Sequence, residues 1–377
     1  MQKNKAWIAA MAGIAVIVII ALVVTMSEKQ TSVLTIGVTL PLSGDAAAYG
    51  KEALNGLNLA ADEINARGGM GGKPIRLAVQ DDQGSPKDGV SALQKLIFTN
   101  PGMQVVIGGG FSQIAAAQIP VCERNGIVLF SPFASNPDLA KPDDCFFRNW
   151  PSDTAEGKEM AEYAYQTPNL RRVAILSSNS DYGVGLRKVF EREFKAVGGT
   201  IPVVLEFAEG DSDFRPQLTR IKDEGADSIY MIGWYKEFAR ILRQARELAV
   251  DVQFLSCVTF NKPELLELAG EAAEGVIFSQ PAYSAEREEP VVQSFVQAYE
   301  GRFGAKPGTY AAQAYDALNL ISEAASQGLD ADDIKRALYQ IKDYPGVTGS
   351  TTFDSNGDVE KPVEFMAVRN GRYVYMN

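Results

Sequence analysis

The chain contains no histidine, and this absence removes several kinds of chemistry at once. Without an imidazole it cannot build Ser-His-Asp or Cys-His nucleophile pairs, nor a zinc site that needs a histidine ligand. An enzyme built on carboxylates or lysine stays open, but the sequence shows no such pairing of nucleophile and base. We therefore expect a protein that binds rather than catalyses, without a cofactor or a metal ion.

Cysteine is also scarce. Cys122, Cys145 and Cys257 are too few and too widely spaced for a metal cluster. In an exported protein Cys122 and Cys145 could form a disulfide, and buried free thiols are the alternative.

Positive charge is in short supply. The sequence has 36 Lys and Arg residues against 47 Asp and Glu residues, a net charge of −11. Phosphate backbones are bound by basic surfaces, so nucleic acid is not an expected partner.

Long apolar runs are rare, with one exception near the N-terminus. Residues 6–26 carry no charged side chain and follow Lys3 and Lys5. The run is long enough to cross a hydrocarbon layer of about 30 Å, and the preceding positive charge directs the rest of the chain outside the cytoplasm. Its end, at 21–23, matches a cleavage site poorly, and no nearby cysteine could carry a lipid. An N-terminal hydrophobic helix kept as an anchor is favoured over a cleaved signal peptide, with residues 1–32 forming leader and spacer.

After residue 33, short apolar runs alternate with helical patterns, which is typical of a parallel sheet covered on both faces. The expected strands are 34–40, 75–81, 105–109 and 127–131, then 172–178, 201–207, 228–233 and 252–256. The expected helices are 51–66, 88–99 and 113–125, then 184–197, 214–224 and 236–248. The second series repeats the first, and each has a Tyr-Gly pair in its first loop, at 49–50 and 182–183. Two similar α/β lobes with a ligand cleft at the carboxyl edges of their strands are predicted.

The last hundred residues predict a strand at 276–280, helices over 290–303, 309–327 and 331–341, and a terminal hairpin. Residues 354–358 resemble the start of a calcium loop, but the twelfth position is Phe365 where a glutamate is needed. A hairpin turn is the better prediction there.

Several segments, among them VTLPLSGDAAAYG, VVIGGGFSQ, FFRNWPSD and DYGVGL, resemble in order and spacing the extracytoplasmic binding proteins of branched-chain amino-acid transporters. The resemblance covers nearly the whole chain after residue 33. It implies a type I periplasmic-binding fold, in which two doubly wound lobes joined by a three-segment hinge close on a small ligand. It also implies a membrane permease of an ABC transporter as partner. Lobe 1 would comprise 33–152 and 281–352, and lobe 2 would comprise 153–280 and 353–377.

The same resemblance implies a ligand site. Ser112 and Ser135 would hold the ligand carboxylate through hydroxyl and backbone N–H groups, and the Phe133 carbonyl would accept from the ligand ammonium. The residues themselves support the serines, since each follows a strand where unpaired N–H groups favour an anion, although a helix cap is the alternative reading. Aromatic wall residues are expected at Tyr182, Trp234, Trp150 and Tyr49, with Tyr235 next to Trp234, and core packing is their alternative.

One departure from the family pattern bears on the ligand. Val258 stands where relatives carry the acid that binds the ammonium group, and Phe111 and Phe133 replace smaller residues. Another acid, such as Asp153 or Asp181, could substitute, or the ligand lacks an ammonium group. The expected function is the solute-binding component of an ABC transporter for a branched-chain or other apolar amino acid. An aromatic or aliphatic carboxylic acid or amide as ligand, or a ligand-sensing receptor subunit, are the alternatives.

The leader can be tested separately. We predict that a chain beginning at Thr31 is soluble and folds unaided, because the apolar run lies upstream, whereas the full-length chain is recovered with membranes. Cell fractionation shows in which fraction each of the two chains is recovered. Full-length protein in the cytosolic fraction would contradict export.

Overall fold

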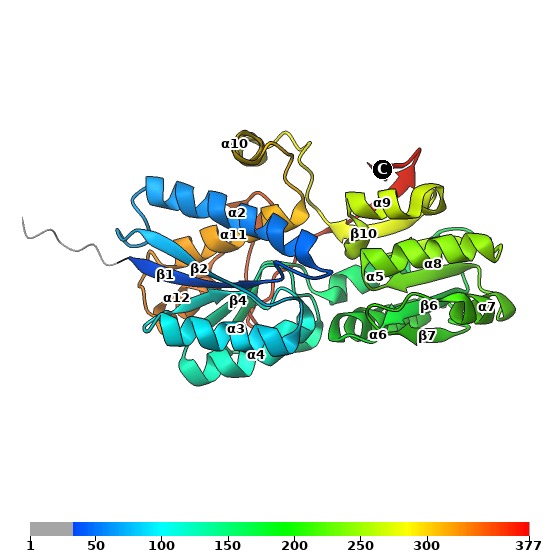
Figure 1. Ribbon diagram of the computed structural model, residues 1–377, viewed down its shortest axis with the longest axis horizontal. Helices are drawn as coiled ribbons and strands as arrows, with labels where there is room; N and C mark the ends of the chain where they lie inside the picture. Colours follow the sequence, from blue (N-terminus) through cyan, green and yellow to red (C-terminus); the bar gives the residue numbers. More distant parts are fainter. Residues whose placement is uncertain (1–32, 377) are drawn as a thin grey trace, which may run out of the picture.

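The structure is a computed structural model that describes residues 33–376. These residues form two α/β lobes side by side, each built around its own sheet (Figure 1). The apolar run at 6–26 and the spacer that follows it lie outside the described residues. Between residues 33 and 376, no helix combines the length and the apolar character needed to cross a membrane.

Lobe 1 is the half that contains the first sheet. Its strands are β1 (Leu34–Leu40), β2 (Ile75–Asp81), β3 (Val105–Ile107), β4 (Val128–Ser131) and β5 (Phe146–Arg148). They lie in the order β2-β1-β3-β4-β5, and all neighbours are parallel. One face is covered by α2 (Ala47–Ala66) and α11 (Thr309–Ala324), the other by α3 (Pro86–Thr99) and α4 (Ser112–Asn125), as Figure 1 shows.

Lobe 2 repeats this plan. Its strands β6 (Val173–Ser178), β7 (Val204–Phe207), β8 (Ser228–Ile232), β9 (Gln253–Ser256) and β10 (Ile277–Pro281) lie in the order β7-β6-β8-β9-β10, all parallel. The antiparallel hairpin β13 (Val363–Arg369) and β14 (Arg372–Tyr375) extends the sheet beyond β10. The helices are α5 (Asp153–Gln166), α6 (Asp181–Ala196), α7 (Arg215–Asp223), α8 (Tyr235–Glu247) and α9 (Pro263–Ala269). The predicted doubly wound α/β architecture with two matching sheets is confirmed.

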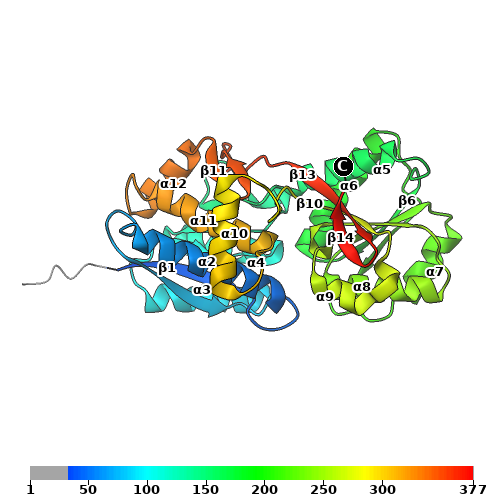
Figure 2. The ribbon, with the colours of Figure 1, turned by 90° about the horizontal axis from the view of Figure 1, so that it is seen from above.

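The chain passes between the two sheets three times. It leaves lobe 1 between β5 and α5 and returns between β10 and α10 (Pro290–Phe303), which packs on α2 over lobe 1 (Figure 2). It then forms α12 (Ala331–Gln340) and a small hairpin of β11 (Tyr344–Gly346) and β12 (Gly349–Thr351), before joining lobe 2 again at β13. The residues at which the lobes divide stay a prediction.

Two helices begin earlier than the sequence indicated. The Tyr-Gly pairs were expected in loops, but both lie in the first turns of α2 and α6. A Cβ atom on Gly50 would lie 2.0 Å from the carbonyl oxygen of Pro41, and one on Gly183 would lie 2.2 Å from that of Ser178. Each helix therefore starts in close contact with the end of the preceding strand, an approach that glycine permits.

Some elements were missed altogether, namely β5, α5, α9, β11 and β12, and the helix expected over 309–327 ends at Ala324. The reason is clearest for α5. Its buried face carries Asp153 and Glu156 besides Met160 and Ala164, so the apolar period that signals a helix is interrupted by acids.

Two local alternatives are also resolved. All three cysteines are free thiols in residues 33–376, so the Cys122–Cys145 disulfide is not formed. Residues 354–358 form a turn in which the Asp354 carboxylate accepts hydrogen bonds from the backbone N–H groups of Asn356 and Asp358, at 2.7 and 2.9 Å. Residues 353 and 359 pair antiparallel across it, so the predicted hairpin turn is confirmed.

Arg148 at the end of β5 ties this turn to lobe 1. Its fully buried guanidinium donates to both carboxylate oxygens of Asp358, at 2.5 and 2.7 Å, and to the Asn136 carbonyl at 2.8 Å. The third connection between the lobes is therefore fixed to the first by a buried ion pair.

We predict that Asp358→Ala destabilises the protein by about 3 kcal/mol, because it leaves a buried guanidinium without its counter-charge. Glu360→Ala is a matched control, since Glu360 is exposed and the charge change is the same. Thermal unfolding measures both, and equal midpoints for the two variants would contradict the role of the pair.

Candidate ligand-binding site

The carboxyl edges of the two sheets face each other, and the segments that follow their strands enclose a small cavity. It is lined by Phe111, Ser112, Phe133, Ser135, Trp150, Tyr182, Trp234, Val258, Thr259 and Tyr310. Seven of the eight residues predicted from the sequence are in this set, and the eighth, Tyr49, contacts the ring of Tyr310. The structure thus brings together residues that are far apart in sequence.

Ser112 is the first residue of α4 and is almost fully buried. Its Oγ lies 3.4 and 3.2 Å from the backbone nitrogens of Ser135 and Asn136, whose N–H groups donate to it. Both acceptor positions of the hydroxyl oxygen are then occupied, so its proton is free to be donated elsewhere. The serine therefore ties the two predicted carboxylate loops together and can offer a hydrogen bond to the cavity.

Ser135 lies in the loop after β4, which Ser131 holds in shape by donating to the Gly109 carbonyl at 2.8 Å and accepting from Ala134 N–H at 3.0 Å. The Ser135 carbonyl accepts the backbone N–H of Asp153 at 2.8 Å. This bond links the loop to the first residue of α5, so the carboxylate side of the cavity is in direct contact with lobe 2.

The walls of the cavity are aromatic. Tyr310, at the start of α11, lies at their centre, with ring centroids 4.9 Å from Tyr49, 5.2 Å from Phe133 and 5.3 Å from Trp150. The sequence-based prediction did not include Tyr310, although it placed the start of a helix at Thr309, the residue before it. It reaches the cavity because α11 packs against α2.

Lobe 2 contributes Trp234, which precedes α8. Its ring lies 4.5 Å from Phe111 and 5.5 Å from Tyr182, and its Nε1 donates to Glu209 Oε1 at 2.7 Å. The Trp234–Phe111 pair closes the inner cavity against an outer chamber between the lobes, whose lining includes Tyr49, Tyr235 and Lys236.

The inner cavity is tight, with about 20 Å³ of free space against about 230 Å³ in the outer chamber. This is room for roughly one water molecule. A ligand of the size of an amino acid can therefore occupy the inner site only if the lobes or the aromatic side chains move.

Two buried acids lie behind the cavity on α5. Asp153 is fully buried, and Glu156 is 4% exposed and accepts hydrogen bonds at Oε1 from Val258 N–H (3.0 Å) and Ser279 Oγ (2.7 Å). Burial raises the pKa of Glu156 to about 7, and burial followed by the charge of Glu156 raises the pKa of Asp153 well above its usual range. Asp181, the other acid considered as a substitute, is exposed.

Three polar contacts hold the lobes together around the cavity. Lys262 of lobe 2 pairs with Glu52 of α2 at 2.6 Å and lies 4.5 Å from the ring centres of both Tyr49 and Tyr310. The Tyr49 hydroxyl donates to the Thr259 carbonyl at 3.2 Å. At the mouth, the half-buried Lys236 and the exposed Asp45 approach to 2.5 Å.

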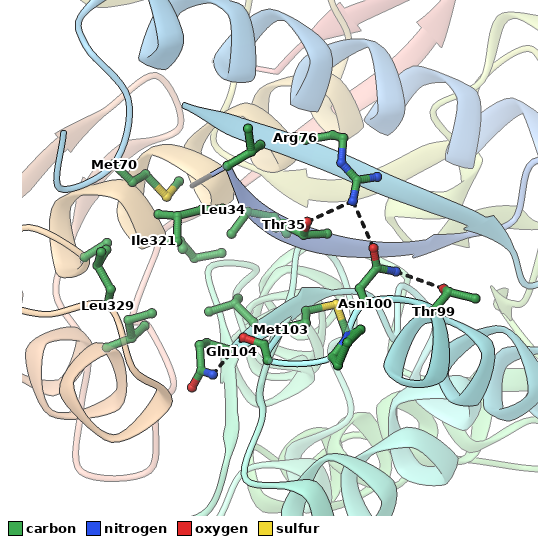
Figure 3. A pocket seen from close by; sticks show the side chains of 17 residues that line it. Leu34, Thr35, Met70, Arg76, Thr99, Asn100, Met103, Gln104, Ile321 and Leu329 are labelled. Carbon is green, nitrogen blue, oxygen red and sulfur yellow. Dashed lines mark hydrogen bonds between the residues drawn. The ribbon is translucent and has the colours of Figure 1, made fainter. Parts of the chain in front are cut away.

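A larger hollow of about 320 Å³ lies at the opposite, amino-terminal edge of the lobe 1 sheet. Figure 3 shows Leu34, Met70, Met103, Ile321 and Leu329 around it. Its polar side chains bind one another, since Arg76 donates to Thr35 Oγ1 at 2.9 Å and to Asn100 Oδ1 at 3.0 Å. This hollow holds none of the residues singled out from the sequence.

Comparison with known proteins agrees with this architecture. Residues 33–372 match the family described as periplasmic binding protein, and the chain belongs to that family. The family consists of solute-binding proteins and is not a class of enzymes.

The chain is similar to curated proteins along most of its length. It is 31% identical over 330 residues to the Leu/Ile/Val-binding protein BraC3 of Rhizobium johnstonii, covering 86% of this chain and 89% of that protein. It is 28% identical over 320 residues to the Leu/Ile/Val-binding protein of Escherichia coli, covering 85% and 86%. Among solved structures, it resembles the branched-chain amino acid transporter substrate-binding protein LivJ of Streptococcus pneumoniae in complex with isoleucine, with a TM-score of 0.84, 31% identity, and coverage of 92% of this chain and 100% of that one.

Proposed function

We propose that this protein is the extracytoplasmic solute-binding component of an ABC transporter and that it captures a branched-chain or other apolar amino acid between its two lobes. The observation that carries the proposal is the convergence of Ser112, Ser135 and a ring of aromatic side chains at the facing carboxyl edges of two sheets. Relatives named for leucine, isoleucine and valine binding support the ligand class.

Ser112 and Ser135 would hold the ligand carboxylate. The Ser112 proton is free to be donated, and the amino end of α4 carries partial positive charge that favours an anion. The aromatic walls then suit an apolar side chain, because they offer a wide surface with few polar atoms.

Closure of the lobes would trap the ligand. We place lobe 1 at 33–152 with 281–352 and lobe 2 at 153–280 with 353–377, so that the three connections act as the hinge. Lys262–Glu52 and Tyr49–Thr259 would form only in the closed arrangement, since each joins one lobe to the other.

A membrane permease would receive the ligand from the closed form. If the apolar run at 6–26 is retained, it would keep the protein at the outer face of the membrane, close to that permease. Release of the run by cleavage would leave a periplasmic protein with the same site.

A second candidate ligand is a carboxylic acid without an ammonium group. Val258 favours it, because the cavity-lining side chain at this position carries no charge. Titration calorimetry with leucine against 4-methylpentanoate, and with phenylalanine against 3-phenylpropanoate, separates the two candidates.

We predict that Ser112→Ala and Ser135→Ala each weaken binding of leucine tenfold or more, because each removes a hydrogen bond to a charged group that contributes about 1.5–3 kcal/mol. Ser228→Ala is the control, since Ser228 is buried at the amino end of β8, away from the cavity. Calorimetry measures the affinities. If both variants bind like the parent, the serines serve only to shape their loops.

We also predict that Lys262→Met weakens ligand binding by about tenfold, because breaking a largely buried ion pair costs more than 1 kcal/mol and here opposes closure. Lys236→Met is the matched control on the more exposed pair at the mouth, because an ion pair near the surface is worth about 0–1 kcal/mol. Small-angle scattering with saturating ligand reports closure directly. Equal losses in the two variants would show that Lys262 does not stabilise the closed form.

A further inference from the structure

The amino-terminal edge of the lobe 1 sheet carries the two most exposed large apolar side chains of residues 33–376. Phe98, in the last turn of α3, is 87% exposed, and Val33, next to the start of β1, is 52% exposed. The other exposed large apolar residues of the described chain are 45% exposed or less and lie apart from this edge. Single exposed apolar residues are common on soluble proteins, so the informative observation is that the two largest exposures share one edge.

Arg76, an exposed residue of β2, links the two apolar residues. Its Nη2 donates to Thr35 Oγ1 at 2.9 Å, and Thr35 lies two residues after Val33. The same nitrogen donates to Asn100 Oδ1 at 3.0 Å, and Asn100 lies two residues after Phe98 (Figure 3). Both acceptors are neutral, so these bonds leave the positive charge of the guanidinium uncompensated. A cation and two exposed apolar groups therefore lie together at this edge.

The charges of residues 68–104 are separated along lobe 1. The acids of this stretch lie at the carboxyl edge of the sheet, and they are Asp81, Asp82 and Asp88. Three of its four bases lie toward the opposite, amino-terminal edge, and they are Lys73, Arg76 and Lys95. Lys95 precedes Phe98 by three residues in α3, a spacing that places the two side chains next to each other on the helix surface. Acids return at the start of α12, with Asp330 and Asp332, so the basic surface is confined to the side of β2 and α3.

The position of the N-terminal apolar run brings this edge close to a membrane. If the run at 6–26 is retained as an anchor, residues 27–32 alone connect it to Val33. Six residues span at most about 20 Å when fully extended. Strand β1 begins at the end of lobe 1 that lies farthest from lobe 2 (Figures 1 and 2). The amino-terminal edge of lobe 1 therefore stays within that distance of the bilayer, whereas lobe 2 extends away from it.

We propose that lobe 1 rests on an anionic phospholipid surface through the Phe98 surface, which consists of Val33, Lys73, Arg76, Lys95 and Phe98. The Phe98 ring lies among the lipid headgroups, a depth that suits apolar side chains flanked by bases, and the three basic side chains lie at the phosphates. The whole chain carries a net charge of −11, so an anionic membrane repels most of its surface and selects this edge. The inference rests on retention of the run at 6–26 and is independent of the ligand in the cleft.

Two other occupants of the Phe98 surface would behave differently. A second copy of the chain would cover Phe98 to an extent that depends on protein concentration. Residues 27–32 of the same chain would cover it in any environment. Neither of these occupants would respond to the charge of the lipid, whereas contact between bases and phospholipid depends on that charge. Coverage of Phe98 that requires anionic lipid therefore identifies the bilayer as the partner.

Hydroxyl-radical footprinting tests this on the unaltered full chain, because an exposed phenyl ring is oxidised and a covered one is protected. The chain is inserted, without ligand, into nanodiscs of phosphatidylcholine alone or of equal parts of phosphatidylcholine and phosphatidylglycerol. We expect oxidation of Phe98 to be about threefold slower or more in the mixed discs, because only these attract the bases. Oxidation of Leu268, an exposed residue of lobe 2, should be the same in both. Equal oxidation of Phe98 in the two kinds of disc would overturn the proposal and leave the proposed function standing, since no ligand is involved.

Lys95→Glu provides the mutational test, because it reverses an exposed charge next to the Phe98 ring. We expect at least half of the protection of Phe98 in the mixed discs to be lost. Lys87→Glu is the matched control, since Lys87 is exposed in the first turn of the same helix and the charge change is the same. Added salt should act like Lys95→Glu on the parent chain, because it screens exposed charges. Equal protection of Phe98 in the two variants would count against the assignment.

Discussion

Parallel strand order is the constraint on which the rest of this structure depends. In each lobe the five parallel strands all end at the same, carboxyl edge of the sheet. Every segment that follows a strand therefore begins on that side. The two edges face each other, and the serines after β3 and β4 line one cavity with the aromatic side chains of lobe 2. Glycine in the first turns of α2 and α6 adds to this, because it lets each helix start directly against the strand end. Tyr49 and Tyr182 are carried into the interface by those turns.

The fold was predictable from the sequence because its signals are local, and most of the cavity was predictable because the resemblance to a known family marked its positions. Ser112, Ser135, Trp150, Tyr182, Trp234 and Val258 each follow a strand or a short connection, and the strand order then brings them together. Tyr310 was not predictable in this way, since it reaches the cavity only through the packing of α11 on α2. Glu156 was missed for a related reason. It lies on a helix whose buried face mixes acids with apolar residues, so neither the helix nor the orientation of its carboxyl group could be inferred from periodicity.

The parts of the site differ in whether their polar and apolar groups already have partners within the protein. The carboxylate loops are satisfied by their own hydrogen bonds, and the aromatic walls by mutual packing, so both are stable without a ligand. Asp153 on α5 is an exception, because neither of its buried carboxyl oxygens has a hydrogen-bond partner among the described residues. Burial of a polar group without a partner opposes folding, and such groups persist where a function compensates for the cost.

The two ion pairs between the lobes differ in their exposure to solvent, and this has a consequence for the rate of closure. The side chains of Lys236 and Asp45 are 31% and 79% exposed, so dissolved ions screen their attraction, whereas Lys262 and Glu52 are 4% and 21% exposed and are screened much less. The outer pair can attract across open water while the lobes are still apart, and the inner pair acts only after water has been expelled. Ionic strength should therefore alter how fast the lobes meet more than how long they stay together.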